Sequence, residues 1–442
     1  MSGRKNNLVR WGLVGWLAWS GGQAQPRLPE PDLPGRRCGT VAYDSLLLRR
    51  HGSRETSRQR LDALVRTHLA EQARSVRAAR ISEEVYRIPV VVHVIHPTRS
   101  GAIGGANNPN ISAEQIQSQL RVLNEDYRRA ANTRGFNTSP IGADTGIEFF
   151  LARTDPNGNP TTGITRHLYT QKTEFDVYDD DLLLSQIAYW PSDRYLNIWV
   201  VPLSGSFLGY GQFPTAASID GLDAETDERT DGVLIDYRVF GTGTGTVTSN
   251  YYAYGRTTTH EVGHWLGLIH TWGDKLCGDD YCADTPPTER PFESLPCRDV
   301  FSNCNGVRTR NLTENYMDYS PDVCMNLFTQ DQKARMRAVL EVSPRRRKLV
   351  RSVNALPETQ TLTVSLSPNP ASVEATLKVQ FAGFQTFTVT VADGTGRIVR
   401  KQAYVDYPGL ALTLPLQGLS PGVYSVRVQT AQEMTTRRLL IY

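Results

Sequence analysis

The sequence predicts a mixed α/β (α+β) domain followed by a small all-β sandwich. Three observations support this prediction. The chain has 442 residues, which is too long for one ordinary domain. Residues 86–341 combine β-branched runs with amphipathic helical patterns, which is typical of an α/β or α+β domain. After about residue 352 only short alternating runs remain, which is typical of a β-sandwich.

The larger domain is expected to begin with a buried strand. Residues 86–95 read Tyr-Arg-Ile-Pro-Val-Val-Val-His-Val-Ile, a β-branched run. Ser112 and Gln115 have capping-box spacing and open an amphipathic helical pattern that extends to about Tyr127. Further strands are expected at 146–153, 196–203 and 232–237.

The C-terminal part shows alternation and turns without a helical pattern. The alternating runs lie at 375–381, 387–391, 410–416, 423–428 and 437–442. Turn signals such as Asp393-Gly394 and Pro421-Gly422 separate them. The cationic stretch at 345–351 and Pro357 are interpreted as a linker between the two domains.

The N-terminus has the pattern of a secretory signal peptide. Arg4, Lys5 and Arg10 precede an apolar run at 11–19, and small residues lead to a cleavage site near Ala24. The run is shorter than the roughly 20 residues that span a bilayer. We therefore expect an exported protein with no transmembrane segment in its mature form.

Net charge and cysteine content further restrict the class of protein. A net charge of +3 gives no support to nucleic-acid binding. Five of the six cysteines lie between positions 277 and 324, and Cys38 stands alone. In an exported protein such a cluster is most often disulfide-bonded. A structural zinc site is the alternative, although no second Cys or His set has suitable spacing.

Residues 260–270 read His-Glu-Val-Gly-His-Trp-Leu-Gly-Leu-Ile-His. Residues four apart share one face of a helix, so His260 and His264 can bind one ion, and Gly267 lets the chain turn so that His270 adds a third ligand. Three neutral imidazoles leave one position for water, which is typical of catalytic zinc. Glu261 can then accept the proton of that water as it attacks a carbonyl.

The long form of this motif is the metzincin signature, which requires a methionine-containing turn beneath the zinc. Met317, within Asn-Tyr-Met-Asp-Tyr-Ser at 315–320, is the candidate for this turn. A single methionine is usually core filler, but the upstream motif and the turn-forming context favour the functional interpretation.

These segments, with Cys-Gly-Asp-Asp-Tyr-Cys-Ala-Asp-Thr-Pro at 277–286, resemble the pappalysin family of metzincins, especially bacterial members of the ulilysin and mirolysin type. The resemblance covers most of residues 86–341. It implies two lobes around a zinc cleft, with residues 209–214 forming the rim strand that pairs with an extended protein or peptide substrate. It also implies that Tyr319 stabilises the oxyanion; packing under the methionine turn is the other interpretation.

The same resemblance implies two disulfides and a calcium site. The implied pairs are Cys277 with Cys304 and Cys297 with Cys324, while Cys282 departs from the family pattern and could be free or compete for Cys277. Family members carry structural calcium, which favours a site that uses Asp280 and Thr285. A solvated acidic turn is the ordinary alternative.

Cys38 lies in Arg-Arg-Cys-Gly-Thr at 36–40, which resembles the cysteine-switch motif in the pro-segments of these relatives. A thiolate is a good zinc ligand and can occupy the position that water needs, so the resemblance implies a latent zymogen. An unpaired cysteine without a role is the alternative.

The last 80 or so residues resemble the sorting domain of the type IX secretion system. The matching segments are 367–370, 393–397, 419–424 and 437–442. This resemblance implies a secreted or outer-surface protein that interacts with the secretion machinery. A substrate-binding β-sandwich is the competing interpretation.

The predicted organisation is a signal peptide at 1–24, a pro-segment at 25–86, a metzincin catalytic domain at 87–344, a linker at 345–360 and a sorting domain at 361–442. The predicted function is that of a secreted zinc endopeptidase made as a latent precursor. A surface-binding protein with an inactive core is the alternative from another class, and the intact His260, Glu261 and Tyr319 argue against it. A zinc hydrolase of non-protein amides shares the metal chemistry but fits the metzincin residues poorly.

Overall fold

The computed structural model describes residues 38–50, 54–74, 84–215, 228–243, 247, 251–353, 362–381, 384–408, 411–430 and 433–442. The expected signal peptide lies outside these residues. Among the helices that are described, none combines the length and apolar character needed to cross a membrane.

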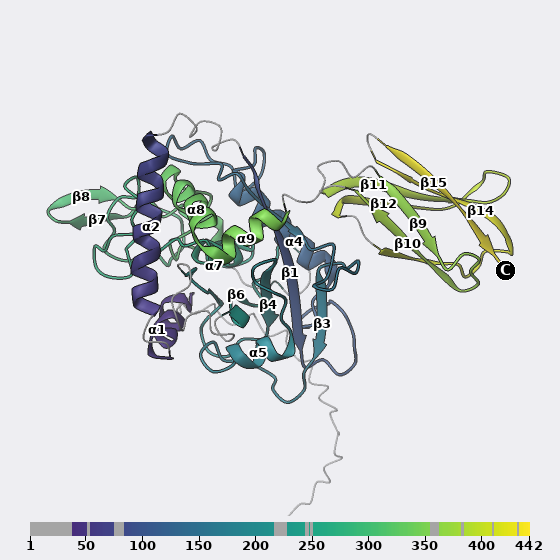
Figure 1. The fold of residues 1–442 in the computed structure, drawn as a ribbon, viewed down its shortest axis with the longest axis horizontal. Coiled ribbons are helices and arrows are strands. Elements are labelled where there is room, and N and C mark those ends of the chain that lie inside the picture. Colours follow the sequence, from purple (N-terminus) through teal and green to yellow (C-terminus); the bar gives the residue numbers. More distant parts are fainter. Residues whose placement is uncertain are drawn as a thin grey trace, which may run out of the picture. The chain divides into compact units, whose positions relative to one another are not determined.

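A six-stranded sheet organises the larger domain (Figure 1). Its strands are β1 (Tyr86–His96), β2 (Ile147–Leu151), β3 (Ile164–Leu168), β4 (Leu196–Val201), β5 (Gly209–Gly211) and β6 (Gly232–Asp236). β1 runs parallel to β2, β3 and β4, and β4 runs parallel to β6. Only β5, at the edge, is antiparallel. The strands predicted near 86, 146, 196 and 232 are thus present, whereas β3 and β5 were not predicted as strands from periodicity.

The helices of this domain are α4 (Ala113–Tyr127), α5 (Asp181–Ile187), α7 (Arg256–Trp265), α8 (Gln330–Val342) and α9 (Pro344–Val353), with a 3₁₀ turn η1 (Asp322–Cys324). The Ser112 side chain caps α4 by accepting from the Gln115 backbone N–H, at 3.2 Å. A hairpin of β7 (Phe301–Cys304) and β8 (Val307–Arg310) lies between α7 and α8 in the sequence.

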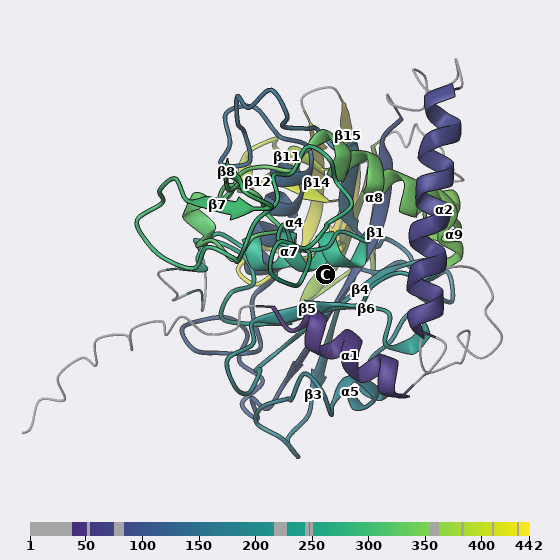
Figure 2. The ribbon, with the colours of Figure 1, turned by 90° about the vertical axis from the view of Figure 1, so that its left-hand side faces the viewer.

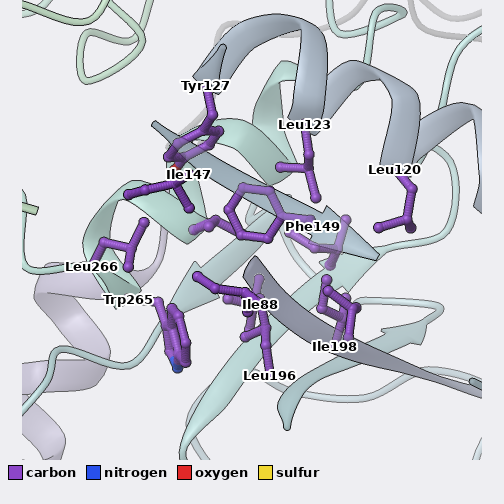
Figure 3. Close-up of a cluster of buried hydrophobic side chains, with 14 of the residues drawn as sticks. Ile88, Leu120, Leu123, Tyr127, Ile147, Phe149, Leu196, Ile198, Trp265 and Leu266 are labelled. Carbon is purple, nitrogen blue, oxygen red and sulfur yellow. The ribbon is translucent and has the colours of Figure 1, made fainter. Parts of the chain in front are cut away.

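The main core lies between the sheet and the helices α4 and α7. Figure 3 shows Leu120, Leu123 and Tyr127 pointing from α4 toward Phe149 and the strands. Trp265 and Leu266, at the end of α7, join the same buried cluster. Burial of one face of α7 fixes its rotation, and this rotation determines where its opposite face points.

Within the part of the chain that the structure describes, two helices precede the sheet in sequence. They are α1 (Thr40–Arg50) and α2 (Arg54–Arg74). Leu61 and Val65 of α2 pack against Ala338 and Val339 of α8, and both views show the two helices side by side (Figures 1 and 2). These residues belong to the segment that the sequence assigns to a pro-segment.

The structure contradicts the interpretation of residues 345–353 as linker. They lie in α9, whose Leu349 and Val350 are buried in the main core. Arg346 is fully buried, donates two 2.8 Å hydrogen bonds to Asp231, and lies 3.7 Å from the Trp265 ring centroid. The apolar face of α9 is not evident in the sequence, because its buried positions recur at helical spacing and are interrupted by three consecutive arginines. Residues 354–360 are not described.

The C-terminal domain is an all-antiparallel β-sandwich with its own core, as predicted. One sheet contains β9 (Thr363–Ser367), β10 (Glu374–Gln380) and β13 (Ala411–Pro415). The other contains β11 (Phe384–Ala392), β12 (Ile398–Pro408), β14 (Gly422–Gln429) and β15 (Met434–Ile441). Alternate side chains of β10 and β14 are buried between the two sheets. The alternation of apolar and polar residues in the sequence therefore predicted correctly which side chains are buried.

Candidate metal centre

Three histidine side chains converge at one point beside α7. The Nε2 atoms of His260, His264 and His270 lie 3.1–3.2 Å from one another, and all three residues are fully buried. His260 and His264 come from the face of α7 opposite the core, as their spacing predicts. His270 returns from the turn that follows the helix.

The other nitrogen of each ring is held by a hydrogen-bond acceptor. Nδ1 of His260 donates to the Tyr316 carbonyl at 2.6 Å, and Nδ1 of His264 donates to the Leu268 carbonyl at 2.8 Å. Nδ1 of His270 contacts the Asp274 carboxylate. Because each Nδ1 carries a hydrogen, the three Nε2 lone pairs face one another.

Such an arrangement fits a bound cation. Neutral rings with converging lone pairs repel unless a positive ion lies among them. Tetrahedral zinc with bonds of about 2.0–2.1 Å separates neighbouring ligand nitrogens by about 3.3 Å, close to the spacing here. The acceptors behind the rings are those that usually orient histidine ligands. The Cys38 sulfur completes a group whose four ligand atoms all lie within 4.8 Å of one another.

Two glycines shape the backbone of this centre. Gly267 has φ +90°, and a Cβ there would lie 2.8 Å from Val339, so the turn toward His270 favours glycine. A Cβ on Gly263 would lie 2.5 Å from the Met317 sulfur. The methionine turn therefore packs directly against α7, beneath the histidines.

The methionine turn is anchored to α8. The Met317 backbone N–H donates to Asn315 Oδ1 at 2.9 Å, and the Asn315 amide exchanges hydrogen bonds with Gln332. Tyr319, half-buried, places its ring 4.9 Å from that of His270 and 4.7 Å from that of Trp272. Trp272 itself stacks on His270 at 4.3 Å.

The Glu261 carboxylate is buried and contacts the segment at 38–40. Thr40 Oγ1 donates to Glu261 Oε2 at 2.8 Å, and the Cys38 thiol donates to the same oxygen at 3.3 Å. Burial and the Glu261 charge raise the pKa of Cys38 well above its usual value. The protein alone therefore favours a neutral thiol, whereas a metal ion favours the thiolate.

The same segment lies along β5. Gly39 donates its backbone N–H to the Gly209 carbonyl at 2.8 Å, and the Gly211 N–H donates to Thr40 Oγ1 at 2.9 Å. A Cβ on Gly211 would lie 2.0 Å from the Glu261 carbonyl oxygen. Glycine at this position lets the edge strand approach α7 closely. Residues 38–40 thus contact both β5 and the residues of the metal centre.

The loop after the third histidine contains both disulfides. They join Cys277 to Cys304 and Cys297 to Cys324, the pairs that the resemblance implies. Cys282 is buried and has a free thiol.

The two expected calcium ligands lie together in this loop. Thr285 Oγ1 lies 2.7 and 2.8 Å from the two Asp280 carboxylate oxygens. Burial raises the pKa of Asp280 to about 7.

Sequence reasoning missed three residues around the metal centre: Thr40, Asp274 and Trp272. Asp274 carried a usable signal, because it follows His270 by four residues and acceptors behind histidine ligands are common. Thr40 lies within the cysteine-switch segment, but its contact with Glu261 depends on how distant segments pack. Trp272 carried no signal of its own, although it stacks on His270 two positions before it.

Comparisons with known proteins agree with this geometry. The model of the peptidase family described as pregnancy-associated plasma protein-A matches residues 186–341, and a secretion-system C-terminal sorting domain matches residues 365–442. An extracellular metalloprotease of Coccidioides posadasii is 33% identical over 246 residues, covering 55% of this chain and 73% of that protein. One from Pyricularia oryzae is 32% identical, covering 65% and 87%.

Solved structures of Tannerella forsythia mirolysin are similar as well. Mature mirolysin with a cleaved peptide is 39% identical, with a TM-score of 0.54, and the match covers 62% of this chain and 98% of that one. A promirolysin mutant is 36% identical with a TM-score of 0.56, covering 72% and 98%. The chain therefore belongs to the pappalysin family of metzincin metalloproteases, as a secreted or cell-surface member with a type IX sorting domain at residues 365–442.

Proposed function

We propose that this protein is a zinc endopeptidase in its latent precursor form. The observation that carries the proposal is the convergence of three Nε2 lone pairs beside the buried Glu261 carboxylate, at the edge of β5. His260, His264 and His270 would hold the zinc ion. Bound zinc would supply Lewis-acid activation of a water molecule and of the peptide carbonyl.

The protein's own residues have distinct roles in this proposal. The edge of β5, once residues 38–40 have left it, binds the substrate backbone by strand addition. Glu261 accepts a proton from the attacking water and transfers it to the departing amine. Its Oε2 accepts from the Thr40 hydroxyl at 2.8 Å in the precursor, so it can accept from a water molecule once Thr40 has left. Tyr319 donates its hydroxyl hydrogen to the carbonyl oxygen as negative charge develops there.

Latency follows from the contacts of residues 38–40. Cys38 takes the position next to the three histidines, and Thr40 hydrogen-bonds the carboxylate that has to accept a proton. The segment also covers the strand edge that a substrate needs. Removal of residues 25 to about 86 would free all three, and the similarity to promirolysin supports this role.

We also propose a structural calcium site at Asp280 and Thr285, which is supported by the short distance between their oxygen atoms. Calcium added to the chelator-treated protein, with zinc restored, should raise the melting temperature. The rise should be absent in Asp280→Asn and present in Asp279→Asn, whose carboxylate lies on the same loop. An equal rise in both variants would contradict the site.

Glu261→Gln is the decisive test of the catalytic role. Mature wild type should digest casein, and a chelator should abolish the activity. Mature Glu261→Gln should keep its zinc, measured by elemental analysis, yet lose at least 10²–10⁴-fold in rate, because the general base is gone. Equal digestion by the two proteins, or none by processed, zinc-loaded wild type, would overturn the proposal.

A further inference from the structure

A buried carboxylate outside the metal centre has its side-chain partners in the pro-segment. The Asp181 side chain is 1% exposed. Its Oδ2 accepts from the Tyr43 hydroxyl at 3.0 Å and from Arg50 Nη1 at 2.7 Å, and Oδ1 accepts from the neighbouring Leu182 N–H. Both side-chain partners belong to α1, so Asp181 loses them when the pro-segment leaves.

The Arg50 guanidinium is bound on two sides. While Nη1 pairs with Asp181, Nη2 donates to the Tyr178 carbonyl at 2.9 Å. A carboxylate and a carbonyl placed in this way match the planar fork of an arginine better than the point charge of a lysine. These two oxygens belong to the catalytic domain and remain after activation.

An aromatic platform lies beside the carboxylate and connects it to the substrate strand. The Tyr43 ring stacks on Tyr210 of β5, with centroids 4.0 Å apart, and Tyr210 is only 2% exposed. Successive residues of a strand point to opposite faces. Because the positions of Gly209 and Gly211 face Glu261, Tyr210 points to the other face, under α1.

We propose that the Asp181 carboxylate, the Tyr178 carbonyl and the Tyr210 ring form an exosite for an arginine side chain of the protein substrate in the mature enzyme. The inference rests on the proposed function, because α1 has to leave. The Asp181 carboxylate lies beside an apolar cluster and loses the Arg50 cation when α1 leaves. Pairing with a new cation then stabilises this carboxylate. A polypeptide that pairs with β5 brings alternate side chains to the face of Tyr210, and a guanidinium can stack on that ring.

The test compares mature wild type with mature Asp181→Asn on casein and on citrullinated casein, in which arginine side chains have lost their charge. The quantity compared is the ratio of kcat/KM on casein to kcat/KM on citrullinated casein. This ratio should be about ten for wild type and much smaller for Asp181→Asn. The difference between the two proteins should lie in KM. Asp193→Asn, which removes a carboxylate paired only loosely with Lys348 at 3.7 Å, is the matched control and should keep the wild-type ratio. A preference for arginine at the scissile bond changes the ratio between the two substrates equally in wild type, Asp181→Asn and Asp193→Asn. It therefore does not contribute to the difference between these proteins.

Equal ratios for wild type and Asp181→Asn would overturn the exosite while leaving the peptidase intact. Absence of chelator-sensitive cleavage by wild type would overturn the proposed function instead. Asp181→Asn should fold in the mature enzyme, because a neutral side chain avoids an unpaired buried charge, and its melting temperature checks this. Tyr210→Ala provides a second, independent variant: its ratio should also fall, whereas Tyr210→Phe should keep it.

Discussion

At the scale of single residues, the metal centre depends on groups that stand behind the ligands. Asp274 contacts Nδ1 of His270, and backbone carbonyls hold the other two rings. The ligands were predictable because helical spacing alone places His260 and His264 on one face. The two supporting carbonyls were not, since a carbonyl carries no residue signature, whereas the position of Asp274 four residues after His270 was a usable signal.

Replacing Asp274 by Ala should weaken zinc binding by about 10- to 100-fold, because His270 loses the acceptor that orients its ring. Competition with a chromogenic chelator measures this affinity in the mature protein. Asp279→Ala, on the same loop, is the control. Unchanged zinc affinity in Asp274→Ala would show that the contact does not support the ligand.

The Thr40 hydroxyl offers a residue-scale test of latency. Thr40→Ala should raise the rate at which the precursor processes itself by about 10- to 150-fold, because a hydrogen bond to a buried carboxylate contributes about 1.5–3 kcal/mol. Thr40→Ser retains the hydroxyl and should behave like wild type. Gel analysis of freshly purified precursor at several dilutions gives the rate. Identical rates for Thr40→Ala and wild type would show that this hydrogen bond does not contribute to latency.

At the scale of elements, the helix α9 shows how charge can hide burial. Arg346 is held by Asp231 and Trp265, while its neighbour Arg347 is exposed. The cationic composition of this segment predicted a linker, because composition does not distinguish a buried arginine from an exposed one. Only the packing of α9 against the core determines which arginine is buried and which is exposed.

Arg346→Ala should therefore lower the free energy of unfolding by about 3–5 kcal/mol, since it leaves Asp231 with less of its compensating charge. Arg347→Ala should change it by less than about 0.5 kcal/mol. Urea unfolding of both variants measures the difference. A small effect of Arg346→Ala would mean that Arg345, which lies 3.2 Å from Asp231, substitutes for it.

At the scale of the whole molecule, stability should depend on pH through His93, which is buried in β1. Nε2 of its ring donates to Asn197 Oδ1 at 3.0 Å, and Nδ1 accepts from the Thr165 hydroxyl at 2.7 Å. Burial lowers the pKa of His93 from 6.5 to about 3. The unfolded chain binds a proton near pH 6.5 and the folded chain does not. The stabilising effect of the neutral ring is thus complete above pH 6.5 and is lost as the pH falls toward 3.

Wild type should lose up to about 1.4 kcal/mol per pH unit more than His93→Gln across that window. Denaturant unfolding of both proteins from pH 7 to pH 4 measures the slope, and the difference between them isolates His93 from other titrating groups. Parallel curves would show that His93 takes up its proton in the folded state.

The sequence by itself determined the class of both domains, the three histidines, Glu261 and the methionine turn. The domain classes and the helix face shared by His260 and His264 depend on local spacing, either the helical repeat or the alternation of strands. His270, Glu261 and the methionine turn were predicted from the longer metzincin motif. Only the tertiary structure decided that Thr40 meets Glu261, that Arg346 lies in the core, and that Asp181 is paired by α1. Cys38 and Glu261 are 223 positions apart in the sequence, and a contact of that kind comes from packing between elements, which no local pattern encodes.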